Sequence, residues 1–382
     1  MGVHHFQMTQ RQYFPHLDLL RVVFVFIVLL HHWMAENPFA FLPFGSTIAF
    51  VLSGFLLTGP LLKGKESEAS YWYTTSRFLA RRLLRTLPVY LLVLFIYVII
   101  NRYHFRQYFI NFLTFTQNYV IAYHKDPITN PIDYIQTWSL AVQEQFYIFL
   151  PLFIYLIPNR FHKLFFIFLS VAGLAIRLWY FSLELPFTYN HYTTECCIDC
   201  FGIGALISYY HCKHPDQLKK LLANKTLLGI LIFLYLCSMP GYYSSSKNEL
   251  DFIYYSLYNN LYRITERTFV SLLSVWFIAW GIYYPSQTLT KFSTHPIINY
   301  TGKISYGIYI YHFLAAATIL KGLYAFGLKP NRFEWWVVCL NFLGTFAVAA
   351  LSFEYIEKPI LKLKDKYFGE KAKQPKKEEL AT

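Results

Sequence analysis

The sequence predicts an all-α protein that crosses a membrane about ten times. Hydrophobic residues make up 55% of its 382 residues and charged residues only 14%, whereas soluble proteins average about 25% charged residues. The apolar residues form nearly continuous blocks, such as 89–100 and 146–157. With their aromatic edges these blocks reach the roughly 20 residues of a membrane-spanning helix. Only helices and closed barrels satisfy their backbone groups in lipid, so a globular α/β protein is excluded.

The apolar blocks, taken in order, predict where the helices lie. They are expected at residues 19–36, 46–63, 83–101, 138–157, 164–182, 197–211, 226–242, 268–284, 304–320 and 334–352. Two polar segments interrupt this series. Segment 102–137 is expected to be an interfacial or partly inserted helix on the outer side, and the tyrosine-rich segment 243–267 to contribute to an outer acceptor site.

Positive charge predicts the orientation. If the N-terminus is inside, the cytoplasmic segments hold 24 of the 34 Lys and Arg residues, which is the excess that cytoplasmic loops carry. Both termini are therefore expected in the cytoplasm. We expect one membrane-embedded domain, residues 1–365, followed by a basic cytoplasmic tail, residues 366–382. The net charge of +13 is attributed to this bias and to the tail, and nucleic-acid binding is not expected.

Ionisable residues inside the predicted spans are the candidates for function, because a charge at that depth is costly. Arg21 and His32 are eleven residues apart in the first helix, so they share a face and lie about 16 Å apart along the axis. His31 points about 100° away. Glu144 in the fourth helix and His312 in the ninth are expected at a depth comparable to that of His32.

These residue types predict general acid–base chemistry. A histidine can remove the proton of a sugar hydroxyl while its oxygen attacks a thioester carbonyl, and a hydrogen-bonded carboxylate would fix the tautomer of the imidazole. We therefore predict His32 and Glu144 as the catalytic residues, and the reverse assignment, with Glu144 as the base, stays open. Ser305, Tyr309 and His312 form one stripe and are expected to support them. The alternative is that these histidines only pack helices together.

Arginines that follow the second predicted helix indicate an anion site: Arg77, Arg81, Arg82 and Arg85. The first, second and fourth of these fall on one helical face, and guanidinium groups bind phosphates in bidentate fashion. Together with Arg21, we expect Arg77, Arg81 and Arg85 to bind the phosphates of an acyl-coenzyme A donor whose arm reaches toward His32. The alternative is that they only anchor a cytoplasmic loop.

Seven motifs occur in the order typical of bacterial acyltransferase family 3. They are LDLLRVVFVFIVLLHH, AFVLSGFLLT, RFLARRLLRTLPVY, WSLAVQEQFYIFLP, IDCFGIGALIS, GKISYGIYIYHF and FEYIEKPI. The first contains the Arg-x10-His spacing of that family, which selects Arg21 and His32. Over nearly all of residues 12–365 the chain resembles this family of integral-membrane enzymes that O-acylate glycans.

The resemblance implies a ten-helix core, an acetyl-CoA-type donor on the cytoplasmic side and a central role for His32. It also implies that Arg77 with Arg81 or Arg85 helps to bind the donor and that Glu144 supports the site. Asp199 is expected to be a further supporting residue. Its partner is left open, because the segment reads CIDC where many relatives carry an Arg or similar polar residue two before the aspartate. Some relatives carry a fused C-terminal hydrolase-like domain, whereas this sequence stops soon after the tenth predicted helix. Acceptor transfer is therefore expected in the membrane core or on a separate partner.

The expected function is transfer of an acyl group, with acetyl as the first expectation, from acyl-CoA to a hydroxyl of a cell-envelope glycan or lipid-linked saccharide. The expected location is the bacterial cytoplasmic (inner) membrane, as a multi-pass protein in the lipid bilayer. No tightly bound cofactor is expected. A metal site at Cys196, Cys197 and Cys200 is not expected either, because no second pair matches them. The alternative is a transporter or exporter of a saccharide or small anion that uses a buried His/Glu proton relay.

Overall fold

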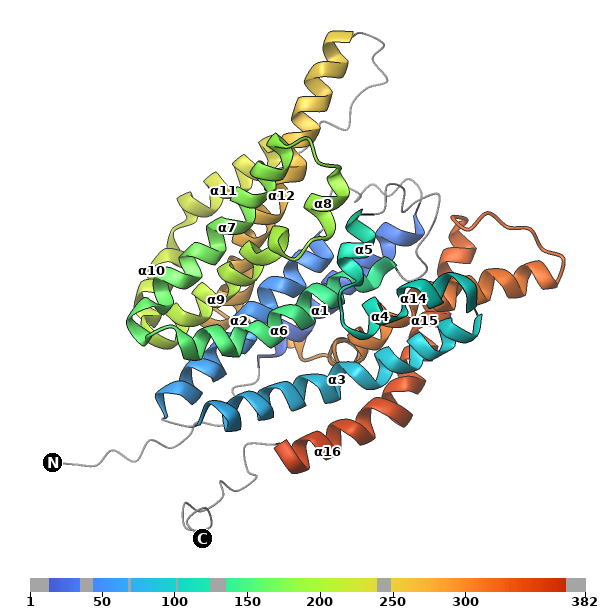
Figure 1. The fold of residues 1–382 in the computed structure, drawn as a ribbon, viewed down its shortest axis with the longest axis horizontal. Coiled ribbons are helices and arrows are strands. Elements are labelled where there is room, and N and C mark those ends of the chain that lie inside the picture. Colours follow the sequence, from blue (N-terminus) through green and yellow to red (C-terminus); the bar gives the residue numbers. More distant parts are fainter. Residues whose placement is uncertain are drawn as a thin grey trace.

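A computed structural model describes residues 14–34, 44–67, 70–100, 102–123, 135–238 and 249–368 of the chain. Within these ranges the chain forms sixteen α-helices and no β-strand. Seven helical segments are long and apolar enough to cross a membrane, and two bent helix pairs raise that number to nine. The protein is thus an all-α, multi-pass membrane protein, as predicted (Figure 1).

Ten helices correspond to the ten that the sequence predicts. They are α1 (Pro15–Trp33), α2 (Phe44–Glu66), α3 (Tyr71–Ile100), α6 (Trp138–Leu156), α7 (His162–Ser182), α9 (Ile198–Lys213), α11 (Lys225–Ser238), α12 (Glu249–Tyr283), α14 (Pro296–Ala325) and α15 (Trp335–Ser352). The shorter elements are α4 (Arg102–Leu113), α5 (Gln117–Tyr123), α8 (Phe187–Tyr192), α10 (Pro215–Ala223), α13 (Gln287–Ser293) and α16 (Lys358–Phe368). At 16 residues, α9 is shorter than the candidate spans.

Two predicted helix starts were wrong by more than ten residues. Helix α3 begins at Tyr71, twelve residues before the predicted start, because arginine, leucine and alanine continue a helix well after the sequence ceases to be apolar. The arginines therefore lie on this helix and not in a loop. Residues 249–267, expected in a polar outer segment, belong to α12, while residues 243–248 lie outside the described residues.

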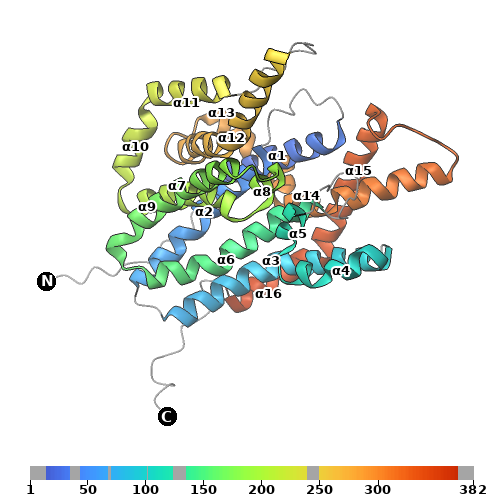
Figure 2. The ribbon, with the colours of Figure 1, turned by 45° about the horizontal axis from the view of Figure 1, so that its top comes forward.

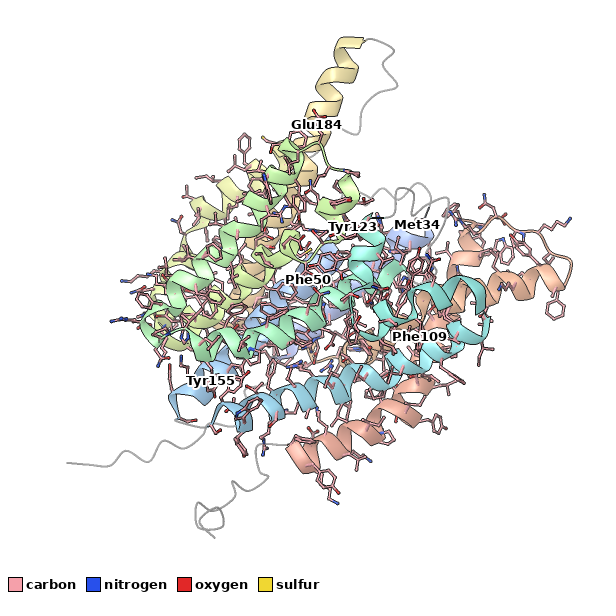
Figure 3. The ribbon with its side chains drawn as sticks, in the orientation of Figure 1. Met34, Phe50, Phe109, Tyr123, Tyr155 and Glu184 are labelled. Carbon is pink, nitrogen blue, oxygen red and sulfur yellow. The ribbon has the colours of Figure 1, made fainter. Side chains whose placement is uncertain are left out.

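The helices alternate in direction through one bundle. Figure 3 shows Met34 after α1 and Glu184 after α7 toward one end of the bundle, and Tyr155 near the end of α6 toward the opposite end. Figures 1 and 2 show α16 lying along α3, and the two helices are in contact. Large apolar side chains such as Leu164, Phe168 and Val171 of α7 are exposed, as expected where a helix faces lipid and not water.

The centre of the bundle depends on a close crossing of α2 and α9. Phe50 of α2 is completely buried and stacks on Phe201 of α9 with the ring centroids 4.9 Å apart. A Cβ atom on Gly54 would overlap the backbone oxygen of Phe201, and one on Gly204 would overlap that of Val51. Small residues at such crossings let helix backbones approach closely in membranes, so these glycines set the position of α2 against α9.

Candidate active site

A cavity of about 140 Å³ lies among α1, α2, α3, α6 and α14. Three arginines line it, namely Arg21 of α1 and both Arg82 and Arg85 of α3. The other polar side chains that line it are Ser46, Ser53, Thr86, Ser139, Gln143, Tyr147, Ser305, Tyr306 and Tyr309. None of the carboxylates in the described ranges does so. Because guanidinium groups bind phosphates with paired hydrogen bonds, this lining suits an anionic ligand.

Carboxylates behind the cavity partly balance these arginines. Arg21 forms an ion pair with Asp18, one turn earlier in α1. Arg85 lies near Arg21, and the carboxylates in its surroundings are Glu357 and Asp18. Two guanidinium groups thus approach each other although like charges repel. That arrangement favours binding of an anion between them.

The carboxylate of Glu357 is positioned by the turn that joins α15 to α16. Residues Phe353–Glu357 form a π-helical turn, an element often found at functional sites. The Ser352 hydroxyl lies 3.4 Å from a carboxylate oxygen of Glu357 and accepts a 3.0 Å hydrogen bond from Tyr311. Glu357 was not among the predicted site residues, although an ionisable residue beside an apolar span is a signal that could have identified it.

The predicted arginine face is only partly present at the cavity. Arg85 lines it, whereas Arg77 and Arg81 do not. Arg77 donates a 2.9 Å hydrogen bond to the Tyr73 hydroxyl one turn earlier, and Arg81 lies near Lys364 of α16. The face of α3 that is turned to the bundle therefore passes through Arg82 and Arg85, at a spacing of three residues, and not through the positions spaced by four.

The two predicted histidines lie together. The rings of His32 in α1 and His312 in α14 are nearly perpendicular, with centroids 5.1 Å apart. His312 is completely buried, and its Nδ1 atom donates a 2.6 Å hydrogen bond to the backbone oxygen of Tyr309. The ring of Phe313 also contacts His32, at 4.7 Å between centroids. Helices α1 and α14 are packed together, and this packing brings the two rings into contact.

Tyr309 connects the arginine-lined cavity to the histidine pair. Its hydroxyl lies 2.8 Å from the Ser139 hydroxyl and donates to the backbone oxygen of Gln136. Tyr309 and Ser139 both line the cavity, and the Tyr309 ring lies 5.9 Å from that of His312. Ser305, one turn earlier in α14, also lines the cavity and donates to its own helix at Gly302. The predicted stripe of α14, Ser305, Tyr309 and His312, thus borders both the arginine-lined cavity and the histidine pair.

Glu144 does not face His32, so the prediction of a hydrogen bond between these two residues was wrong. Its side chain is 2% exposed and lies beside Thr86 and Arg82 of α3. The ionisable neighbours of His32 in the described ranges are His312 and His31. The rise per residue predicts depth along a helix but not the rotation of α6 about its axis, and that rotation turns Glu144 toward α3. One carboxylate oxygen of Glu144 has no hydrogen-bond partner among the described residues.

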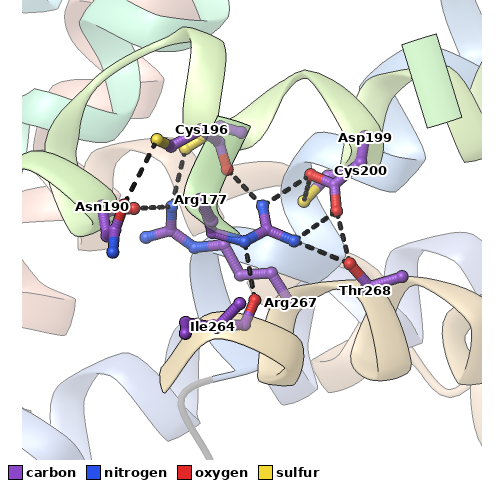
Figure 4. A network of polar contacts seen from close by, with 9 residues as sticks. Arg177, Asn190, Cys196, Asp199, Cys200, Ile264, Arg267 and Thr268 are labelled. Atoms are coloured by element: carbon purple, nitrogen blue, oxygen red, sulfur yellow. Dashed lines mark hydrogen bonds and ion pairs between the residues drawn. The ribbon is translucent and has the colours of Figure 1, made fainter. Parts of the chain in front are cut away.

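The partner of Asp199, which the sequence left open, is Arg177 of α7 (Figure 4). Arg177 is completely buried and donates to both carboxylate oxygens, at 3.0 and 2.7 Å. It also donates to the Ile264 backbone oxygen and to the Thr268 hydroxyl of α12. Asp199 does not line the cavity, so its contacts hold α7, α9 and α12 together. Arg177 was missed, although an arginine within a predicted span was the signal for it.

A second buried arginine, Arg267, completes this network (Figure 4). It donates to the backbone oxygens of Asn190 and His191 and to the sulfur of Cys197, the last at 2.9 Å. The three clustered cysteines are buried free thiols. Within the described ranges, no group of three or more His, Cys, Asp or Glu side chains could hold a metal ion.

Comparison with known proteins identifies the family. The chain is 27% identical over 378 residues to the peptidoglycan O-acetyltransferase OatA of Listeria monocytogenes, covering 92% of this chain and 56% of that protein. It is 25% identical over 402 residues to the O-acetyltransferase OatA of Staphylococcus aureus, covering 95% of this chain and 60% of that protein. The chain therefore spans less than two thirds of the length of these relatives. No solved structure matches it. The family model of the acyltransferase domain of acyltransferase family 3 matches residues 14–354, and the chain belongs to that family.

Proposed function

We propose that the protein transfers an acyl group, acetyl in the first instance, from acyl-CoA to a hydroxyl of a cell-envelope carbohydrate. One observation carries this proposal: a cavity lined by Arg21, Arg82 and Arg85 adjoins, through Tyr309, the contact between His32 and His312. The arginines suit the phosphates of a coenzyme A thioester, and a histidine suits proton removal from a hydroxyl. Membership of an acyltransferase family supports the same reaction.

The donor is proposed to enter from the cytoplasm. The excess of positive charge predicts that the start of α1 is cytoplasmic, and Arg21 is nearer that end of α1 than His32 is. A donor whose phosphates bind near Arg21 and Arg85 would extend its thioester along α1 toward His32. The protein is accordingly assigned to the bacterial cytoplasmic membrane, with the acceptor approaching from the opposite side.

In the proposed reaction, the acceptor oxygen attacks the carbonyl carbon of the thioester while His32 removes the hydroxyl proton. The bond between the carbonyl carbon and sulfur breaks, and the coenzyme A thiolate leaves and takes up the proton that His32 removed, which returns His32 to its neutral form. The products are an O-acyl ester and free coenzyme A. The hydroxyl nucleophile belongs to the acceptor, so no serine of the protein is needed.

The acceptor is proposed to be a glycan of the cell wall. The relative from Listeria monocytogenes is named as a peptidoglycan O-acetyltransferase, which makes peptidoglycan fragments the first acceptor to test. A proton-coupled transporter is less well supported, because Glu144 lies beside Thr86 and Arg82 and not beside either histidine. The His/Glu relay that a transporter would need is therefore not assembled in the described part of the chain.

Release of coenzyme A by the purified protein, measured with acetyl-CoA and peptidoglycan fragments, tests the proposal. The wild-type protein is expected to release coenzyme A in proportion to ester formed on the glycan, as measured by mass spectrometry. His32→Ala should lower turnover by about 10²–10⁴-fold, the usual contribution of a general base. His31→Ala, a matched change on the adjacent and exposed ring, should leave it nearly unchanged. Wild-type turnover in His32→Ala would remove His32 from the mechanism.

A further inference from the structure

One nitrogen of His312 has no hydrogen-bond partner among the described residues, although the residue is completely buried. Its Nδ1 atom lies 2.6 Å from the Tyr309 backbone oxygen. A carbonyl oxygen can only accept, so Nδ1 must carry the proton. In the neutral ring, Nε2 is then an unprotonated acceptor that is held in place and lacks a donor. Leaving such a buried acceptor unpaired is costly, so a donor is expected to reach it in the working enzyme.

The donors considered for Nε2 are those on the aromatic rings that contact His312 in the described part of the chain. The rings in contact with it are those of His32, Trp33, Tyr309 and Phe313. Phe313 has no polar hydrogen, and the Tyr309 hydroxyl already donates to the Gln136 backbone oxygen. Among these rings, the available donors are an N–H of His32, at 5.1 Å between ring centroids, and the indole N–H of Trp33, at 6.1 Å, which has no hydrogen-bond partner among the described residues.

We propose that His312 is a positioning residue whose Nε2 accepts a hydrogen bond from His32 during catalysis. The ring centroids are 5.1 Å apart, close enough for rotation of the His32 ring about its Cβ–Cγ bond to bring an N–H group to Nε2. This bond leaves the other nitrogen of His32 unprotonated and directed away from His312. The inference rests on the proposed function, in which that second nitrogen removes the hydroxyl proton.

This arrangement replaces the carboxylate that the sequence predicted beside His32. In a catalytic triad the carboxylate fixes the tautomer of the histidine and stabilises the imidazolium that forms. Here a neutral imidazole with a fixed tautomer fixes that of His32, and its hydrogen bond strengthens when His32 becomes charged. Glu144 cannot serve in this way, because it lies beside Thr86 and Arg82.

Replacing His312 by one residue without a hydrogen-bond acceptor and by one with an acceptor tests the proposal. His312→Phe keeps a ring but removes the acceptor, and His312→Gln places a carboxamide oxygen near the position of Nε2. We expect His312→Phe to lower kcat by about 10²-fold, at the low end of general-base effects, while the KM values for donor and acceptor stay within twofold. We expect His312→Gln to recover at least about tenfold of that loss. A residue that only fills space would be replaced better by Phe than by Gln.

The variant Trp33→Phe distinguishes the two possible donors, and an NMR measurement reports on the His32 tautomer directly. Trp33→Phe should leave kcat within about twofold of wild type, since Trp33 is not the group that acts on the substrate. A Trp33→Phe loss as large as that of His312→Phe would overturn the assignment, as would wild-type kcat in His312→Phe. If the Phe variant does not fold, the tautomer of His32 can be read from ¹⁵N-histidine solid-state NMR. The proposal expects one dominant tautomer in wild type and a mixture in His312→Leu, and an unchanged spectrum would refute it.

The same measurements separate this inference from the proposed function. If the wild-type protein does not consume acetyl-CoA, the proposed function fails, whereas the NMR result still reports whether the two rings are hydrogen-bonded. If wild type is active and His312→Phe is equally active, the proposed function stands and the positioning role is refuted. His31→Ala is the matched control for altering a ring beside His32, because the centroids of those two rings are 5.6 Å apart.

Discussion

Replacing Asp199 by Ala should destabilise the protein more than any change at its surface. The substitution leaves the Arg177 guanidinium, which is 0% exposed, without the carboxylate to which it donates at 3.0 and 2.7 Å. Removing one partner of a buried ion pair costs about 3–5 kcal/mol, because the other charge stays buried and uncompensated. The hydrogen bonds from Arg177 to Ile264 and Thr268 hold the guanidinium in place, so it cannot move to water.

Thermal unfolding in detergent, followed by size-exclusion chromatography of heated samples, measures this effect. Asp199→Ala should lower the apparent Tm by several degrees, and the double variant Arg177→Met/Asp199→Leu should recover part of the loss, since it removes both charges. Glu66→Ala is the matched control. Its ion pair with Lys213 is 37% exposed on both sides, and such pairs contribute at most about 1 kcal/mol. An unchanged Tm in Asp199→Ala, or a double variant less stable than both single variants, would contradict the stabilising role of the buried ion pair between Arg177 and Asp199.

Three further outcomes are expected. Arg85→Gln should raise the KM for acetyl-CoA by about tenfold or more, since a charged hydrogen bond contributes about 1.5–3 kcal/mol. The control Arg77→Gln should change this KM less than twofold. A larger effect of Arg77→Gln than of Arg85→Gln would place the donor elsewhere. Gly204→Leu should prevent folding, because the added side chain meets the α2 backbone. Gly229→Ala should be tolerated, because a Cβ atom there meets no described atom within 4 Å. The yield of monodisperse protein measures both effects. Glu184→Cys in a background without cysteines should react with an impermeant reagent on intact cells, and reaction only after lysis would reverse the topology.

The helices and the common depth of His32 and His312 could be predicted from the sequence, because both depend on hydropathy and on spacing along one helix. The run of apolar blocks predicted ten helices, and His32 and His312 were notable because ionisable residues are costly within such blocks. Their depths follow from the rise per residue alone. In the structure the centroids of these two rings are 5.1 Å apart. Depth along each helix and the shared helical face made this contact plausible but could not give the distance between the rings.

What the sequence could not predict depends on how each helix is rotated against its neighbours. Glu144 lies at a plausible depth but is turned toward α3, and Arg82, not Arg81, faces the cavity. For the arginines, one residue position on α3, a rotation of about 100°, separates the predicted Arg81 from Arg82, which lines the cavity. The pairing of Arg177 with Asp199 joins helices α7 and α9, and no spacing rule within one helix indicates such a partner.

A cryo-electron microscopy structure with a hydrolysis-resistant acetyl-CoA analogue bound would test most directly whether the arginine-lined cavity and the histidine pair form one site. We expect one continuous ligand, with phosphates in contact with Arg21, Arg82 or Arg85 and with the acyl carbonyl beside Tyr309 and within reach of His32. Density for the analogue outside the cavity, or with its acyl end directed away from the histidine pair, would contradict the claim that these two features form a single site.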